Sequence, residues 1–310
     1  MSNFILQSTI GSVLAQDYPN IEYIIADDGS YNFDEAMLSE FIKDNRKANI
    51  VAVKIIHNEN NIGTVKNMNN AYKLATGKYV VNVSMEDYFL NDDTLSRIIE
   101  RAESLNSNIL SYGRYLCSSD SQILRSMPCR TWESKIAKLN TAEKQYVALI
   151  TGRSYEMVSG SSVCLKRTFV EDLGCFDEQF KLWEDGPFFA KATRTGNVIH
   201  TAYDIRGLMY RVGGVSGDGA PKLKQNCTNN AMLDCDSKRF LIFESETIPP
   251  KIGLTNRRII KYNRRRSLDK SKFDQLFSYL LFLDVVIHNT FFRYGIVKDI
   301  KCELDEYAAN

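Results

Sequence analysis

The sequence predicts an α/β fold, with a mainly parallel sheet flanked by helices and a helical extension at the C-terminal end. Two observations predict it. Short apolar runs alternate with stretches of helical periodicity through the first third of the chain, and the first and third of these runs end in acidic turns. Strands separated by helices form βαβ units, whose ligands lie beyond the carboxyl ends of the strands.

The elements follow one another with clear boundaries. Apolar residues at helical spacing predict a helix over 4–16. Apolar runs predict strands over 21–26, 51–56 and 78–83, and the stretches that follow them predict helices over 33–43, 65–75 and 92–104. Gly77 follows the second of these helices, as expected for a C-terminal cap. Beyond Pro221 the composition favours helix, and 273–288 has the pattern of one helical stretch.

Composition excludes several classes of protein. The chain has 310 residues, 44% of them apolar and 25% charged, which is typical of a globular protein with a sizeable core. The formal net charge of +1 argues against a broad nucleic-acid-binding surface. No apolar stretch is long enough to predict a membrane span. The seven scattered cysteines indicate reduced thiols in a cytoplasmic protein rather than disulfides or a zinc site.

Two acidic turns follow the first and third predicted strands: Asp27-Asp28 and Glu86-Asp87. Carboxylates at the tips of neighbouring parallel strands are suited to binding a nucleotide and a divalent cation that bridges two phosphates. Acidic residues are also common in turns for purely local reasons, because they hydrogen-bond their own backbone. The matching positions of the two turns favour the binding interpretation.

Several blocks of the sequence resemble family 2 glycosyltransferases of the bacterial surface-polysaccharide type, which have a GT-A fold. The blocks are IEYIIADDGS, NENNIGTVKNMNNAYKLATGKYVVNVSMEDYF and LGCFDEQFKLWEDGPFFAK, and their order and spacing match the family over about 4–216. The resemblance implies a nucleotide-sugar-binding half over 1–105, an acceptor-binding and catalytic half over 106–220, and a helical extension over 221–310.

The resemblance also implies roles for individual residues. In the nucleotide-binding part, Asp27 and Asp28 would contact the base and ribose, and Asn61 and Gly63 would lie in the loop over the nucleotide. Lys66 and Asn69 fall on the helix that follows this loop.

The family's metal motif, Asp-x-Asp-Asp, aligns with Ser84 to Asp87. A serine therefore replaces its first acid, and Glu86 and Asp87 would hold Mn²⁺ or Mg²⁺ together with the donor diphosphate.

The family's general base aligns with Asp185, preceded by Glu184. Such a base removes a proton from the acceptor hydroxyl while that oxygen attacks the anomeric carbon with inversion. Two adjacent carboxylates before Pro187 also suit the beginning of a helix, and that structural interpretation stays open. Arg211, in the Gly-containing stretch 210–216, would provide a counter-charge to the pyrophosphate. An ordinary surface loop is the alternative there.

The C-terminal part carries a basic run with six Lys or Arg residues between 257 and 266, followed by the helix-like apolar stretch 273–288, which is too short to span a membrane. A basic amphipathic element of this kind can lie on the inner face of an anionic cell membrane, where a lipid-linked acceptor would be found. The alternative is a helix packed on the domain, with a solvated basic face.

Family members usually begin with a strand that is central in the sheet, whereas this chain opens at the helix that follows it. The resemblance therefore implies a slot in the core, unless another segment fills the gap or the strand lies upstream. The function expected is a non-processive inverting hexosyl or N-acetylhexosaminyl transferase, moving a sugar from a nucleotide-diphosphate donor to a polysaccharide or lipid-linked hydroxyl. The alternative is a truncated, inactive member that only binds a nucleotide or a partner protein.

Overall fold

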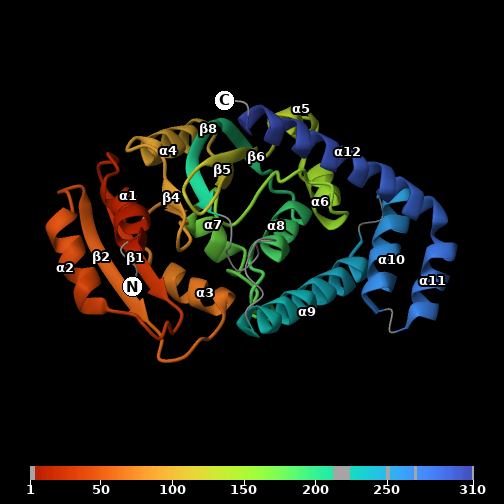
Figure 1. Ribbon diagram of the computed structural model, residues 1–310, viewed down its shortest axis with the longest axis horizontal. Coiled ribbons are helices and arrows are strands. Elements are labelled where there is room, and N and C mark those ends of the chain that lie inside the picture. The colour runs from red at the N-terminus through yellow and green to blue at the C-terminus, as the bar shows by residue number, and fades with distance from the viewer. Residues whose placement is uncertain (1–3, 212–223, 249–251, 269–270, 309–310) are drawn as a thin grey trace.

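The computed structural model describes residues 4–211, 224–248, 252–268 and 271–308. Helices cover both faces of a central sheet, and a helical C-terminal part extends to one side (Figure 1). The predicted α/β architecture and the helical extension are confirmed.

The first third of the chain follows the predicted order of elements. It contains η1 (Ile5–Ile10), a π-helical segment that continues into α1 (Gly11–Leu14), and then β1 (Ile21–Asp27), α2 (Glu35–Asn45), β2 (Ile50–His57), α3 (Thr64–Leu74), β3 (Tyr79–Val81), β4 (Tyr88–Phe89) and α4 (Thr94–Ser104).

The middle part adds the remaining strands: β5 (Ile109–Cys117), β6 (Ile123–Met127), α5 (Arg130–Ile136), α6 (Ala142–Ile150), β7 (Val163–Lys166), α7 (Arg167–Asp172), α8 (Asp185–Arg194) and β8 (His200–Arg211). The C-terminal part is helical throughout its described residues: α9 (Lys224–Glu246), α10 (Leu254–Leu268), α11 (Lys272–Leu281) and α12 (Leu283–Ala308).

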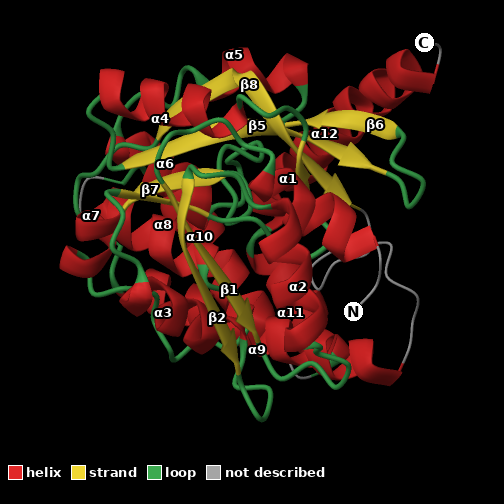
Figure 2. Cartoon of the chain, turned by 90° about the vertical axis from the view of Figure 1, so that its left-hand side faces the viewer, coloured by secondary structure: helices red, strands yellow, loops and turns green. Residues whose placement is uncertain are grey.

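The strands form two sheets (Figure 2). A parallel pair, β1 and β2, is separate from a larger sheet with the order β3-β7-β5-β8-β4, on which β6 pairs with β5. In the larger sheet only β5 and β8 pair in parallel, so the expected mainly parallel sheet is a mixed one. The middle part of the chain causes this difference. Strand β7 pairs antiparallel with both β3 and β5, β8 pairs antiparallel with β4, and a short turn joins β5 to an antiparallel β6.

Alternating side chains divide the core between the two faces of the larger sheet. Ile109 and Leu165 face one hydrophobic cluster with α6 and α8, whereas their neighbours Leu110 and Cys164 face a second cluster with η1, α1 and α4. The boundary expected near residue 105 would separate β3 from β7, but these two strands pair with each other in one continuous sheet.

The slot expected between the first strand and the rest of the sheet is present. Among the described residues no strand lies between β1 and β3, and a cavity of about 760 Å³ is lined by both of them. Helix η1 contributes Ile5, Thr9 and Ile10 to its wall, and α3 contributes Met68 and Tyr72. Residues along β1 and β3 are therefore only half-buried although they lie inside the molecule.

Candidate active site

One end of this cavity brings together three segments that the sequence singles out. Its lining includes Asp27 from the end of β1, Ser84 from the turn after β3, and Glu184 from the beginning of α8. Since β1 and β3 both end here, the cavity mouth lies at the carboxyl ends of the strands, where α/β proteins bind ligands.

Asp27 is buried and anchors the end of β1. Its Oδ2 accepts hydrogen bonds from the Ser30 backbone N–H at 2.8 Å and from His57 Nδ1 at 2.8 Å, and the His57 ring stacks on Phe33. Burial alone would raise the pKa of Asp27, but the hydrogen bonds from Ser30 and His57 hold it below its ordinary value. The carboxylate is therefore a fixed negative charge.

Asp28 holds the loop that the sequence assigns to the nucleotide. Its two carboxylate oxygens accept hydrogen bonds from the backbone N–H groups of Ile62 at 2.8 Å and Gly63 at 3.0 Å. Gly29 makes this approach possible: its φ is +77°, and a Cβ there would lie 2.6 Å from the backbone of Asn60. Asp28 thus shapes this loop in addition to any contact with a ligand.

The other donor-side residues divide into two groups. Asn61 and Lys66 are exposed near this loop, where a ligand can reach them. Asn69 is buried, and its amide exchanges hydrogen bonds with the Phe176 backbone and donates to Glu178 Oε1. These bonds use the amide for packing α3, so we leave Asn69 out of the proposed donor contacts.

The turn from Ser84 to Asp87 contains the expected metal ligands. Glu86 has a φ of 74° and a half-exposed carboxylate, whereas Asp87 is buried. Asp87 Oδ1 accepts a hydrogen bond from the Arg211 backbone N–H at 3.2 Å, and its Oδ2 has no partner among the described residues. Burial raises the pKa of Asp87 to about 7, and the Arg211 N–H and the charge of Arg114 oppose the rise.

These residues fit a hard divalent cation in part. An unpartnered carboxylate oxygen beside an exposed carboxylate is a suitable donor set, but Ser84 supplies no charge. Within the described ranges, no group of three His, Cys, Asp or Glu side chains is arranged to hold a metal ion. Phosphate oxygens of a donor would have to complete the coordination.

Arg211 lies beside this turn at the end of β8. Its guanidinium group is 3.9 Å from Glu86 Oε2, stacks on the Phe4 ring and donates to the Ser119 carbonyl. The rest of the expected loop, 212–216, lies outside the described residues.

Glu184 and Asp185 begin α8. Asp185 accepts hydrogen bonds from the backbone N–H groups of Gly160 at 2.9 Å and Gly186 at 2.6 Å. A Cβ on Gly160 would lie 2.6 Å from Glu184 Oε1, so a larger residue there would displace the Glu184 carboxyl group. Burial and then the charge of Asp185 raise the pKa of Glu184 from 4.5 to about 8. The pair therefore combines a carboxylate held by backbone donors with a neighbour that retains its proton.

The turn that precedes this pair is held from a distant helix. Asp236 of α9 is only 2% exposed, and its Oδ2 accepts hydrogen bonds from three consecutive backbone N–H groups, those of 181–183, at 2.8, 2.8 and 3.2 Å. The carbonyl of Lys181 in turn accepts a hydrogen bond from the N–H of Val65, next to the nucleotide loop. Asp236 was not predicted from the sequence, because no local pattern relates it to a turn some fifty positions away.

The pattern of acidic turns, glycine-shaped loop and carboxylate pair agrees with a known family. The sequence model described as "Glycosyl transferase family 2" matches residues 5–162, just over half of the chain. The chain belongs to this family. The resemblance inferred from the sequence blocks is thereby confirmed.

Relatives of this family 2 protein include an "Uncharacterized glycosyltransferase" of Haemophilus influenzae, 28% identical over 36% of this chain and 32% of its own length. Another is the Escherichia coli protein named "UDP-Glc:alpha-D-GlcNAc-diphosphoundecaprenol beta-1,3-glucosyltransferase WfaP", 27% identical over 64% of this chain and 72% of its own length. The chain spans only about a third of the length of two of the curated relatives that it matches.

Solved structures confirm the GT-A fold of this family member. S. aureus TarS 1–349 in complex with UDP superposes with a TM-score of 0.51 at 18% identity, covering 94% of this chain and 88% of TarS 1–349. The mannosyltransferase PcManGT from Pyrobaculum calidifontis, in complex with GDP-Man and Mn²⁺, gives 0.55 at 15% identity, covering 100% of this chain and 83% of that one. At these identities the likeness shows the fold alone.

Proposed function

We propose that this family 2 protein is a non-processive, inverting glycosyltransferase. It transfers a sugar from a nucleotide-diphosphate donor to a hydroxyl group of a polysaccharide or lipid-linked acceptor. The observation that carries the proposal is the Asp185 carboxylate, held by two backbone N–H groups beside the cavity mouth that also contains Asp27 and Ser84. The names of WfaP and of the UDP-bound TarS structure support a nucleotide-sugar donor.

In this proposal each carboxylate has a separate task. The loop held by Asp28 binds the nucleotide, with Asn61 and Lys66 within reach of the donor. Asp185 accepts the proton of the acceptor hydroxyl as its oxygen attacks the anomeric carbon. Gly160 and Gly186 fix the direction of the Asp185 carboxylate, so little reorientation is needed at the moment of reaction. Glu184, which keeps its proton, adds no second negative charge.

The test of this mechanism is donor-dependent release of nucleoside diphosphate. We expect Asp185→Asn to reduce turnover by about 10²- to 10⁴-fold, because the neutral amide removes the general base while keeping the size of the side chain. The exposed Asp172, on α7, provides a matched control as Asp172→Asn, which should retain full activity. Unchanged release by Asp185→Asn would refute the proposed mechanism. Product stereochemistry, read by NMR of the new linkage, tests inversion.

A divalent cation belongs to the same proposal. Glu86 and Asp87 would hold Mn²⁺ or Mg²⁺ together with the donor diphosphate, and the ion would offset charge on the departing nucleoside diphosphate. The Mn²⁺-bound PcManGT supports this choice of ion. We expect Glu86→Ala to abolish the dependence of donor binding on Mn²⁺, measured by calorimetry with UDP. Equal Mn²⁺-dependent binding by both proteins would show that the site lies elsewhere.

An inactive copy that only binds nucleotide is not favoured, since the carboxylate pair and the nucleotide loop are both assembled. The release experiment separates the two functions. An inactive copy would bind UDP and yet release none from a UDP-sugar under any acceptor condition.

A further inference from the structure

The C-terminal helices expose apolar side chains in a regular pattern. Helix α11 is largely exposed, and its one buried residue is Ser278. The side chains of Phe273, Leu276, Phe277 and Leu280 are 75%, 56%, 48% and 65% exposed. Their spacing of i, i+3, i+4 and i+7 defines one face of a helix. The helix is thus inverted relative to an ordinary surface helix, because its polar serine faces the protein and its apolar face is turned outward.

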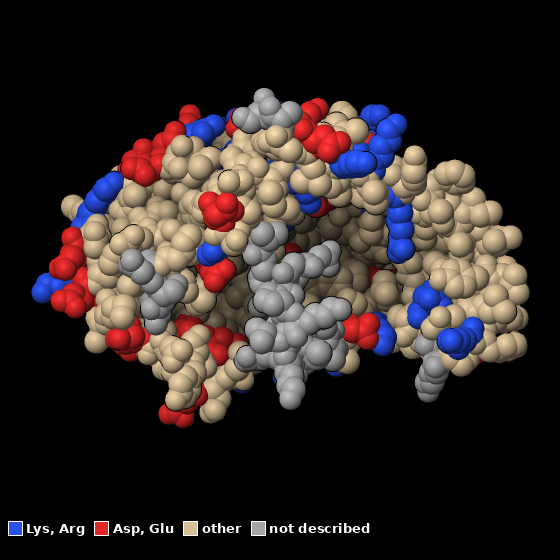
Figure 3. Space-filling model, viewed as in Figure 1, with Lys and Arg blue, Asp and Glu red and all other residues tan. Residues whose placement is uncertain are grey.

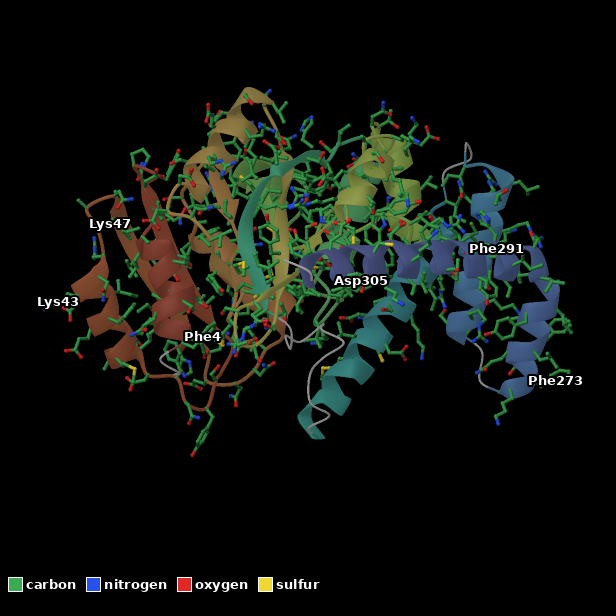
Figure 4. The ribbon with its side chains drawn as sticks, turned by 45° about the horizontal axis from the view of Figure 1, so that its top comes forward. Phe4, Lys43, Lys47, Phe273, Phe291 and Asp305 are labelled. Atoms are coloured by element: carbon green, nitrogen blue, oxygen red, sulfur yellow. The ribbon has the colours of Figure 1, made fainter. Side chains whose placement is uncertain are left out.

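Helix α12 continues the pattern. Leu283, Ile287, Phe291 and Tyr294 follow helical spacing and are between 49% and 74% exposed. We name these four residues, together with the four of α11, the apolar stripe. Phe273 lies at the outer end of α11, away from the body of the molecule (Figure 4). An exposed apolar surface of this size and regularity indicates a binding partner.

The apolar stripe is held in place by a fixed elbow. The stretch 273–288, expected as one helix, is broken at Phe282, where α11 and α12 meet at 91°. Phe282 is buried with Ile259 and Val285, and Arg258 of α10 pairs with Asp284 at 2.6 Å. The burial of Phe282 therefore stabilises a bend here in place of a continuous helix. The bend leaves both halves of the apolar stripe exposed.

Basic groups border the apolar stripe. Over 254–288 the sequence has eight Lys or Arg against three Asp or Glu, a net charge of +5 in a chain whose total is +1. The guanidinium groups of Arg265 and Arg266 lie over the rings of Phe277 and Tyr279 at 5.1 and 4.8 Å. In the space-filling view this end of the molecule is largely tan with blue groups at its edge (Figure 3).

We infer that the apolar stripe docks on the surface of an anionic lipid membrane. An apolar helical face bordered by Arg and Lys matches the interface between acyl chains and anionic headgroups. Helix α11, with ten residues, is too short to span a bilayer, and no single described helix is long and apolar enough to cross one, although the bent pair α11–α12 together meets that criterion. The elbow lies in the interface, with the basic side chains at the headgroups.

The membrane contact therefore lies on α11 and α12 rather than on the basic helix α10. The basic helix α10 buries Ile259 and Ile260 against the protein, as the packed-helix alternative requires. The neighbouring α11 and α12 provide the apolar contact, and α10 contributes charge at its edge.

The experiment is co-sedimentation of the full chain with vesicles of phosphatidylcholine and phosphatidylglycerol. We expect wild type to bind these vesicles, to bind phosphatidylcholine alone much more weakly, and to lose part of its affinity at high salt. Phe273→Ser/Leu276→Ser/Leu280→Ser should reduce the partition coefficient by at least ~10-fold. The matched control replaces three exposed apolar side chains elsewhere, Met37→Ser/Val51→Ser/Leu105→Ser, and should bind like wild type.

Phe291→Ser/Tyr294→Ser on α12 is a second, independent variant and should also weaken binding. Because all these side chains are exposed, thermal unfolding and nucleotide binding should not change. Equal binding of wild type and both stripe variants would overturn the inference. So would a wild-type dimer, seen by sedimentation velocity without vesicles, that the stripe variants convert to monomer, because a second copy would then cover the stripe.

Discussion

Two regions around the cavity differ in how well their polar groups are hydrogen-bonded. One is the turn that carries Glu184 and Asp185, and the other is the slot between β1 and β3. The turn 181–185 is held by Asp236 on one side and by Gly160 on the other. The slot leaves one edge of β1 and one of β3 without a neighbouring strand among the described residues, and the hydroxyl of the buried Thr9 without a partner there.

This difference indicates which contacts fix the geometry of the site. The carboxylate pair takes its position from α8, α9 and the 159–162 segment, which belong to or pack on the larger sheet. The nucleotide loop is attached to β1, whose only strand partner in the described chain is β2. We therefore expect catalytic geometry to depend on contacts around the turn, and the slot to affect mainly stability.

The largest effect should come from breaking the hydrogen bonds that hold the turn. Asp236→Ala leaves three backbone N–H groups without their acceptor, so the turn before Asp185 should shift. A displacement of about 1 Å at a catalytic group costs on the order of 100-fold in rate. We expect kcat to fall by about that factor, with a loss of about 1–3 kcal/mol in the free energy of unfolding.

Asp236→Asn keeps an acceptor oxygen for the three N–H groups and should therefore retain most of the wild-type kcat. If the negative charge of Asp236 were what matters, Asp236→Asn would lower kcat as much as Asp236→Ala. The control is Asp234→Ala on the same helix, because Asp234 is exposed and forms an ion pair with Lys238. If Asp236→Ala lowered stability but left kcat unchanged, Asp236 would not position the carboxylates.

A smaller effect should appear as a pH dependence of stability. The folded chain keeps a proton on Glu184 up to about pH 8, whereas the unfolded chain loses it near 4.5. Between these values the folded state binds more protons, so the free energy of unfolding decreases as the pH rises. Glu184→Gln should remove this slope, which amounts to at most ~5 kcal/mol across the window. Urea denaturation at several pH values measures it, and parallel slopes for the two proteins would contradict the raised pKa.

The sequence predicted local elements and chemistry better than long-range arrangement. The seven elements expected before residue 105 are all present, because each depends on apolar periodicity. The predicted cap at Gly77 was wrong, since α3 ends at Leu74 with Ala75 as its C-cap, and Gly77 has no positive φ. The proximity of Asp27 to the turn at Ser84 was predicted from their places at strand ends, whereas that of Glu184 was predicted only through the family resemblance. Asp236 and the bend at Phe282 were missed, since both depend on packing between segments that are distant in sequence.

The smallest effect should be a gain in stability at the slot. Thr9 lines it with a buried hydroxyl that has no partner among the described residues, and burying such a group costs free energy. Thr9→Val keeps the shape of the side chain and removes that cost, so we expect the free energy of unfolding to rise by about 1 kcal/mol and Tm by about 2–4 °C. Ser12→Val, one turn further on, is the matched control with the opposite sign. The Ser12 hydroxyl donates to the Thr9 carbonyl at 2.9 Å and accepts from the Phe89 N–H at 3.0 Å. If Thr9→Val destabilised the protein as Ser12→Val should, the Thr9 hydroxyl would have a partner in solution, and the slot would be filled.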